Sequence, residues 1–243
     1  MLIVQISDIH AGAYNQSILL DAIDEINGLE PDAVLVTGDL TENGLLIEFE
    51  EAKKHIDKIK AKEVIVLAGN HDYRHTGYLL FKKFFKSKQL YEFDECIIAT
   101  LSTARPDRDE GEVGYRQCLW LNDSLKDKDR LKIIAMHHHL IAAPDTGSDR
   151  IIVLDAGDVL HAALTSKVDL VLCGHKHRPW LWNLGSLTIG YAGTVSSIKM
   201  RGFFHNSYNI IEITDRIKID LKIVNRERIP LEKIVSMQEF VEK

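Results

Sequence analysis

The sequence contains few cysteines and no long hydrophobic run. Cys96, Cys118 and Cys173 are odd in number and form no CxxC pair, which argues against a disulfide framework and favours a reducing compartment. No stretch approaches the roughly 20 apolar residues that span a bilayer, and the N-terminus lacks the basic leader of a signal peptide. We therefore expect a cytoplasmic protein with no membrane segment.

An excess of positive charge is also missing. The 30 Lys and Arg residues against 36 Asp and Glu residues give a formal net charge of −6, so no global attraction toward nucleic acid or an anionic membrane is expected. A nucleic-acid partner is therefore not favoured, although a local patch could still hold a strand. A hydrophobic content of 45% suffices for one substantial core. We expect a single domain over residues 1–243, with a terminal helix at 230–243.

Short hydrophobic segments alternate with helical patterns in the first part of the chain. Residues 2–7, 33–37 and 64–68 are rich in Val, Ile, Leu and Ala, which is typical of buried strands. Residues 16–29 and 45–60 carry apolar side chains at three- and four-residue steps, which is typical of amphipathic helices. The resulting β-α-β-α-β order predicts an α/β fold with parallel strands and crossover helices.

The pattern changes after residue 90. Buried strands are still expected at 132–136 and 168–173, and residues 104–117 have the charged, Gly-containing composition of a surface loop. The remaining extended segments are shorter and lie at 93–101, 187–192, 207–213 and 216–224. We expect a second, more antiparallel sheet from them, with the last two forming a hairpin.

Five short polar motifs each begin where a predicted strand ends. They are Asp8-Ile9-His10, Gly38-Asp39, Gly69-Asn70-His71-Asp72, Met136-His137-His138-His139 and Gly174-His175-Lys176-His177. Ligands of open α/β sheets bind at the carboxyl ends of the strands, so these motifs are expected to converge. Carboxylates, imidazoles and one carboxamide are the ligand set of two adjacent transition-metal ions rather than of one structural zinc.

The spacing within the motifs suits this chemistry. Residues two positions apart point to the same side of an extended chain, so Asp8 and His10 can bind one ion, and His175 and His177 repeat that spacing. Asp39, placed at the end of its strand, can serve two ions at once. Two carboxylates about 4 Å apart repel by about 4 kcal/mol at the dielectric of a protein surface, and divalent cations turn this repulsion into attraction.

The other motif residues complete the expected site. Asn70 offers a neutral oxygen that adds a ligand without adding charge. His71, next in the chain, would point away from Asn70 and is available to the substrate. His137 directly follows its strand and completes the shell of the second ion, whereas His138 or His139 would take that place if the strand ended later.

Taken in order, these motifs resemble the pattern D-x-H, G-D, G-N-H-D/E, H and G-H-x-H of the calcineurin-like metallophosphoesterase superfamily, over residues 1 to about 195. The resemblance implies a four-layer α/β/β/α sandwich with two mixed β-sheets and an active site at the carboxyl ends of strands. It implies one ion bound by Asp8, His10, Asp39 and His177, and a second bound by Asp39, Asn70, His137 and His175.

The resemblance also implies a mechanism. Two ions lower the pKa of a shared water, and the resulting hydroxide attacks phosphorus in line with the leaving group. His71 stabilises the developing charge or protonates the departing alkoxide. Related sites often orient this histidine with a carboxylate three residues beyond the bridging Asp. Glu42 occupies the matching position, and Asp72 is the other candidate.

These observations together predict a metal-dependent phosphodiesterase acting on a small phosphodiester. The chain looks most like the small phosphodiesterases that include bacterial cyclic-nucleotide phosphodiesterases. Manganese is the expected metal, with iron or zinc as alternatives, and Arg74 and His138 are additional candidates for substrate contacts. A nuclease and a non-catalytic scaffold are the alternative functions, but a scaffold fits poorly because no ligand is lost. The oligomeric state cannot be derived from the sequence.

Overall fold

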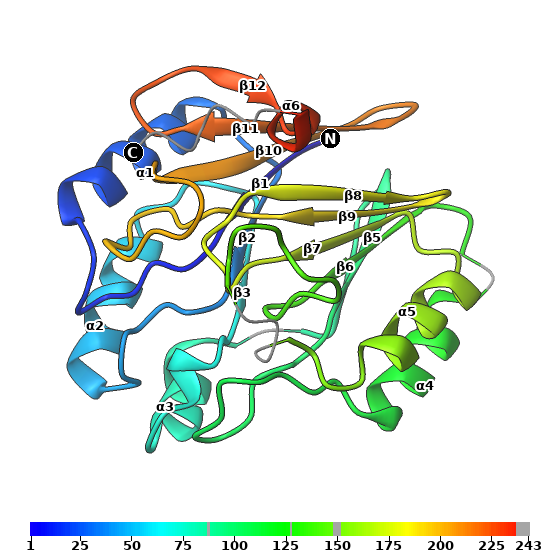
Figure 1. Cartoon of the computed structure of the whole chain (residues 1–243), viewed down its shortest axis with the longest axis horizontal. Helices are drawn as coiled ribbons and strands as arrows, with labels where there is room; N and C mark the ends of the chain where they lie inside the picture. Colours follow the sequence, from blue (N-terminus) through cyan, green and yellow to red (C-terminus); the bar gives the residue numbers. More distant parts are fainter. Residues whose placement is uncertain (87, 127, 148–151, 237–243) are drawn as a thin grey trace.

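A computed structural model of the chain describes residues 1–86, 88–126, 128–147 and 152–236. Two six-stranded mixed β-sheets pack face to face, and helices cover both outer faces (Figure 1). Helices α1 (Gln16–Gly28), α2 (Leu46–Ile56) and α3 (Gly77–Phe84) lie on the first sheet, and α4 (Tyr115–Leu125) and α5 (Ala156–Thr165) lie on the second. This arrangement confirms the four-layer α/β/β/α sandwich.

The first sheet has the strand order β12-β11-β10-β1-β2-β3. Its strands are β1 (Leu2–Ile6), β2 (Ala33–Thr37), β3 (Glu63–Leu67), β10 (Ser207–Ile213), β11 (Ile217–Ile223) and β12 (Arg228–Pro230). Strands β1, β2 and β3 are parallel and are joined by α1 and α2, which confirms the predicted β-α-β-α-β order.

The second sheet has the strand order β4-β5-β6-β7-β9-β8. Its strands are β4 (Leu90–Glu92), β5 (Cys96–Thr100), β6 (Leu131–Ala135), β7 (Leu170–Cys173), β8 (Trp180–Leu184) and β9 (Leu187–Tyr191). The four inner strands are parallel, and only the edge strands β4 and β8 are antiparallel to their neighbours.

The expectation of a second, more antiparallel sheet built from the late segments is wrong. The predicted hairpin of residues 207–213 and 216–224 does form, as β10 and β11, but it joins the first sheet through β1. Antiparallel pairing with β10 occupies the edge of β1 that β2 leaves open, so the backbone groups on both edges of β1 are paired. The hydrophobic pattern of a strand shows that it is buried, not which sheet it joins.

The C-terminal helix is only partly within the described residues. Helix α6 covers Glu232–Ser236, whereas residues 237–243 of the predicted 230–243 helix lie outside them. None of the helices in the described ranges has the length and apolar content that crossing a bilayer requires.

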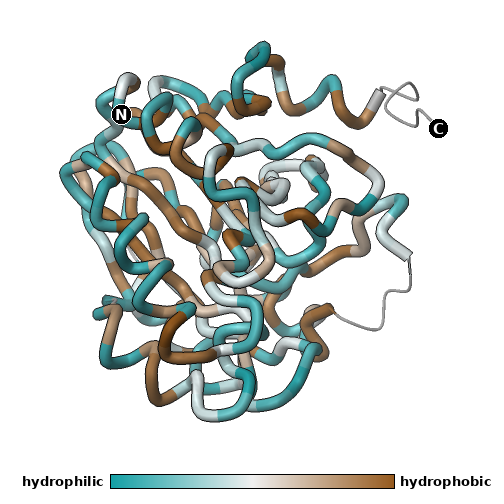
Figure 2. The backbone as a smooth tube through the Cα atoms, turned by 90° about the vertical axis from the view of Figure 1, so that its left-hand side faces the viewer, coloured by the Kyte–Doolittle hydropathy of each residue, from teal (hydrophilic) through white to brown (hydrophobic). Residues whose placement is uncertain are grey.

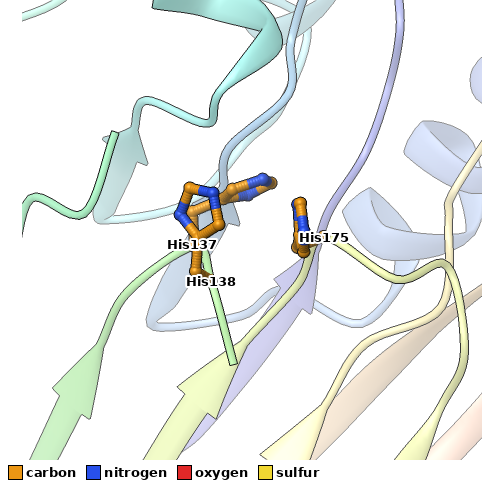
Figure 3. Close-up of side chains that lie close together, drawn as sticks. All are labelled: His137, His138 and His175. Carbon is orange, nitrogen blue, oxygen red and sulfur yellow. The ribbon is translucent and has the colours of Figure 1, made fainter. Parts of the chain in front are cut away.

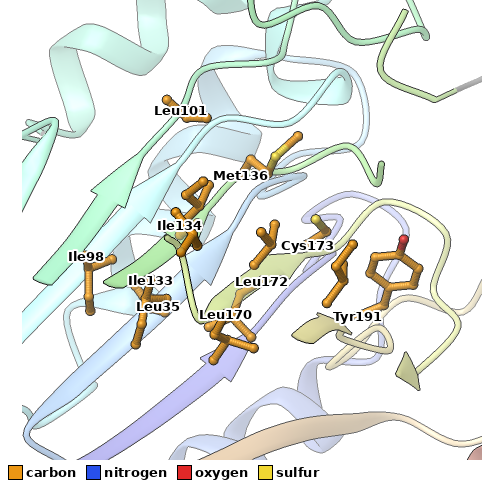
Figure 4. Close-up of a cluster of buried hydrophobic side chains, with 14 of the residues drawn as sticks. Leu35, Ile98, Leu101, Ile133, Ile134, Met136, Leu170, Leu172, Cys173 and Tyr191 are labelled. Atoms are coloured by element: carbon orange, nitrogen blue, oxygen red, sulfur yellow. The ribbon is translucent and has the colours of Figure 1, made fainter. Parts of the chain in front are cut away.

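The side chains of the first-sheet strands point alternately to the two faces of the sheet, and this alternation produces the layers. Ile3 and Leu35 belong to the core cluster that includes the second sheet, whereas Val4 and Val34 belong to the cluster with α1 and α2, because successive side chains of a strand point to opposite faces. Leu35 lies among second-sheet side chains in Figure 4. Hydrophobic and hydrophilic residues alternate along the helices in Figure 2, as expected for helices with one buried face.

Replacing Leu35 with Ala tests the core between the sheets. The Leu35 side chain is 0% exposed, so Leu35→Ala leaves a cavity and should lower the free energy of unfolding by about 2–5 kcal/mol in urea denaturation. Ile47→Ala is the control, because Ile47 is 71% exposed and its loss should change stability by no more than about 0.5 kcal/mol. Equal stability of the two variants would contradict the proposed packing.

Candidate active site

Loops from both sheets bring the polar motifs together at the carboxyl ends of the parallel strands. The loops after β1, β2, β3, β6 and β7 carry, in that order, Asp8 and His10, Asp39, Asn70 and His71, His137, and His175 and His177. Figure 3 shows His137 and His175 side by side beyond the ends of their strands. All seven predicted metal ligands are between 0% and 7% exposed. Their convergence agrees with the expectation, and their role as ligands stays a prediction.

Backbone strain is concentrated in these loops. Five of the predicted ligands have positive φ, between 51° and 76°, namely Asp8, His10, Asp39, His175 and His177. Such left-handed conformations are uncommon for residues other than glycine and cost about 1–3 kcal/mol each. Strain of this kind persists where the surrounding structure enforces it, and it often marks a functional site.

Two glycines allow the loops to approach one another. A Cβ atom on Gly69 would lie 2.1 Å from Oδ1 of Asp39, and one on Gly174 would lie 1.9 Å from Oγ of Ser7. Both distances are far below any contact that two atoms tolerate. The glycines of the G-N-H-D and G-H-x-H motifs are therefore required by close packing beside the ligands.

One group of converging atoms comes from Asp8, His10 and His177. Nε2 of His10 lies 3.0 Å from Nε2 of His177, which lies 3.3 Å from Oδ1 of Asp8. His10 Nδ1 donates to the Glu42 carboxylate and His177 Nδ1 donates to the Lys199 carbonyl, so in the neutral rings both Nε2 atoms present lone pairs. Oδ1 of Asp8 is buried with no hydrogen-bond partner in the described ranges. A cation between these three atoms would satisfy all of them.

A second group comes from Asn70, His137 and His175. Oδ1 of Asn70 lies 3.2 Å from Nε2 of His137 and 3.0 Å from Nδ1 of His175. Nδ1 of His137 donates to the carbonyl of Thr37 at 2.7 Å. Once the His137 ring is neutral, as a metal ligand must be, its Nε2 turns a lone pair toward the Asn70 oxygen, which is also an acceptor.

Asp39 lies between the two groups. Its Oδ2 is 3.4 Å from Nε2 of His137 and 3.7 Å from Nε2 of His10, while its Oδ1 accepts from the backbone N–H of His71 at 2.9 Å. Ligand atoms about 2.1 Å from one ion lie roughly 3.0–3.5 Å apart at right or tetrahedral angles. Most of the observed separations fall in this range, so the residues fit two ions that share Asp39.

The protonation states of Asp39 and His137 also fit a cation site. Burial alone would raise the pKa of Asp39, but His137 and the other nearby histidines lower it well below its usual range. Burial would lower the pKa of His137, but the Asp39 carboxylate raises it to about 9. These shifts favour a protonated His137 beside an ionised Asp39 in the absence of metal, and an ion bound by the two side chains would displace that proton.

The structure places Glu42 differently from the expectation. His71 Nδ1 donates to the backbone carbonyl of Glu42 at 2.6 Å, whereas the Glu42 carboxylate binds His10 Nδ1 and Lys199 Nζ and lies 3.9 Å from His71. Nε2 of His71 lies 3.3 Å from Nη2 of Arg74. The carbonyl of Glu42 therefore orients His71, while its carboxylate orients His10.

Asp72, the other candidate for orienting His71, has a structural role. Its carboxylate accepts from the backbone N–H groups of Leu40, Thr41 and Gly69 and from the Thr41 hydroxyl. Burial and the nearby Asp39 raise the pKa of Asp72 to about 6. These contacts join the loop after β2 to the loop after β3, and they hold Asp39 and Asn70, two of the predicted ligands, in position.

His138 is not available to a substrate, in contrast to the expectation. Its side chain is fully buried and both ring nitrogens are occupied. Nδ1 accepts from the Thr103 hydroxyl at 2.8 Å, and Nε2 donates to the backbone carbonyl of Asp109 at 3.0 Å. The His138 ring lies beside His137 and His175 (Figure 3), but it faces the loop of residues 101–114.

A pocket with a volume of about 160 Å³ opens above the two groups. His71 and Arg74 line it, as expected, together with Asp109, Lys199 and Arg201, which the sequence does not single out. Asp109 lies on a segment predicted only as a surface loop, and Lys199 and Arg201 lie in the connection between β9 and β10. These connections carry no recognisable motif, so only their charge could have suggested them.

Comparison with known proteins identifies the family. The family described as Calcineurin-like phosphoesterase matches residues 1–179. A "Probable cyclic nucleotide phosphodiesterase" of Rhodococcus erythropolis is 26% identical over 86% of this chain and 73% of its own length. A "Probable glycerophosphodiester phosphodiesterase" of Arcobacter nitrofigilis is 29% identical over 75% of each chain.

Solved structures agree in fold. A dimetal phosphatase from Danio rerio superposes with a TM-score of 0.69 at 14% identity, covering 95% of this chain and 98% of that one. A purple acid phosphatase from yellow lupin gives a TM-score of 0.73 at 15% identity, covering 94% of this chain and 52% of that one. Since the family match spans 179 of the 243 residues, the chain belongs to the calcineurin-like phosphoesterase family.

Proposed function

We propose that the protein is a dinuclear-metal-dependent phosphodiesterase that hydrolyses a small phosphodiester. The observation that carries this proposal is the pair of converging lone-pair groups that share Oδ2 of Asp39, with His71 beside them. The pocket volume of about 160 Å³ is below the roughly 300–1,000 Å³ of sites for drug-sized ligands, which favours a small substrate. The names of the relatives support a diester rather than a monoester.

The two proposed ligand sets are those that the family resemblance implies. Asp8, His10, Asp39 and His177 would hold one ion, and Asp39, Asn70, His137 and His175 would hold the other. This mixture of oxygen and nitrogen ligands suits manganese, with iron or zinc as alternatives. When bound, the ions supply the nucleophile by lowering the pKa of water and neutralise the phosphoryl oxygens.

The chain's own side chains handle the leaving group. His71 is fixed through Nδ1 and its Nε2 faces the pocket. The doubly protonated ring can therefore donate the Nε2 proton to the departing oxygen and is left neutral, with its Nδ1 proton still directed at the Glu42 carbonyl. Arg74 Nη2, 3.3 Å from Nε2 of His71, is within reach of a phosphoryl oxygen bound beside His71.

Glu42 supports the site from outside the pocket. Its carboxylate accepts from His10 Nδ1 at 2.9 Å and thereby keeps the lone pair of Nε2 directed inward. Burial would raise the pKa of Glu42, but hydrogen bonds from His10 and Lys199 lower it to about 2. The carboxylate therefore stays ionised throughout the neutral range.

The preferred class of phosphodiester can be tested directly. The relatives carry names of two diester classes, cyclic nucleotides and glycerophosphodiesters. A panel with Mn²⁺ that compares these classes with linear dinucleotides and monoesters would identify the preferred class. Adding oligonucleotides over a salt series tests the nuclease alternative, because nucleic-acid binding is strongly salt-dependent.

Asp39→Asn should abolish hydrolysis of bis(p-nitrophenyl) phosphate. The wild-type protein should bind two Mn²⁺ ions per chain and cleave this diester, whereas the amide cannot supply the shared anionic oxygen. We expect kcat/KM to fall by more than about a hundredfold, beyond the usual effect of losing a supporting partner. Asp24→Asn is the control, since Asp24 is exposed on α1. Full activity of Asp39→Asn would remove Asp39 from the mechanism.

His71→Gln should slow cleavage of poor leaving groups more than that of good ones. Loss of a general acid costs about 10²–10⁴-fold in kcat when the departing oxygen is strongly basic, but a nitrophenolate departs without a proton. Steady-state rates for a glycerophosphodiester and for bis(p-nitrophenyl) phosphate should therefore separate, with Mn²⁺ affinity unchanged. An equal loss with both substrates would assign His71 a different role.

A further inference from the structure

A carboxylate outside both predicted ligand sets contacts the Asn70 amide. Oδ1 of Asp109 accepts from Nδ2 of Asn70 at 3.2 Å and from Nη2 of Arg74 at 3.4 Å. Building on the proposed function, we propose that Asp109 is a positioning residue that keeps the Asn70 carboxamide oxygen directed at the metal site.

The orientation of Asn70 decides whether it can be a ligand. A half-turn of the amide exchanges Oδ1, which has lone pairs, with the NH₂ group, which has only donors. In the observed orientation Oδ1 faces His137 and His175. The Asp109 carboxylate can only accept hydrogen bonds, so it pairs with the NH₂ group and repels the oxygen. Asp109 therefore selects the ligating orientation.

Asp109 is itself held in place by the residues around it. Its backbone carbonyl accepts from Nε2 of His138 at 3.0 Å, and the His138 ring is fixed in turn by the Thr103 hydroxyl. A Cβ atom on Gly111 would lie 2.5 Å from Cγ of His138, so the loop can rest on this ring only with glycine there. These contacts give His138 a role in supporting the metal site through Asp109.

The negative charge of Asp109 also favours metal binding. Arg74 lies beside His71 at the pocket, where its positive charge opposes the binding of cations. Asp109 pairs with Arg74 and offsets that charge. Removing the carboxylate would both release the Asn70 amide and leave Arg74 without this partner, and each change weakens metal binding.

Mn²⁺ titration of the full chain by isothermal calorimetry tests the proposal. Asp109→Ala should raise the Kd of one of the two ions about tenfold, the usual effect of losing a partner that orients a ligand. Asp109→Asn should raise it less, because an acceptor oxygen is kept. The melting temperature should not change, since the Asp109 side chain is 59% exposed. Glu110→Gln is the matched control, because Glu110 lies in the same loop and pairs with Arg108.

The outcomes separate this inference from the proposed function. A Kd for Asp109→Ala within twofold of the wild type would overturn the inference, as would an equal loss in Glu110→Gln. Failure of the proposed function looks different, because the wild-type protein would then bind no pair of Mn²⁺ ions. Tenfold weaker binding in Asp109→Ala alone, at unchanged melting temperature, would support the inference.

Discussion

The site depends on the close approach of buried carboxylate and imidazole groups that come from both sheets. Nε2 of His10 faces Nε2 of His177, and Oδ2 of Asp39 lies between the two groups. Burying ionised or unpaired polar atoms costs several kcal/mol unless a partner of opposite charge is present. Under the proposed function divalent cations would be that partner, and they would displace the protons that the histidines hold without metal.

The sandwich can hold such an arrangement because its rigid part lies directly beneath it. Parallel strands from both sheets end at the same edge, and their side chains form the continuous core around Leu35 (Figure 4). The positive φ values of Asp8, Asp39 and His175 are tolerated because packed strands fix the chain just before each residue. A looser scaffold would relax these turns and disperse the side chains.

The sequence predicts the inner part of this site better than its surroundings. Motifs at strand ends identify His10, Asp39 and the other converging side chains, because residue type and strand periodicity are both local properties. The hairpin of β10 and β11 was correctly expected, but its place in the first sheet depends on a pairing some 200 residues away in the chain. The contact of His71 with the carbonyl of Glu42 could not be predicted either, since any residue type offers a carbonyl.

The hydrogen-bond partners of the motif residues explain why the motif residues could be predicted and their surroundings could not. His137 and His177 are held by backbone carbonyls, and Oδ2 of Asp8 accepts from the backbone N–H of His175. Backbone partners cannot be recognised in a sequence, because every residue type has a carbonyl group. A side-chain partner such as Asp109 lies in a loop whose conformation is set by tertiary contacts. The chemistry common to the family can therefore be inferred from short motifs. The loops of residues 101–114 and 192–206 bring Asp109, Lys199 and Arg201 to the pocket, and only the three-dimensional structure reveals them there.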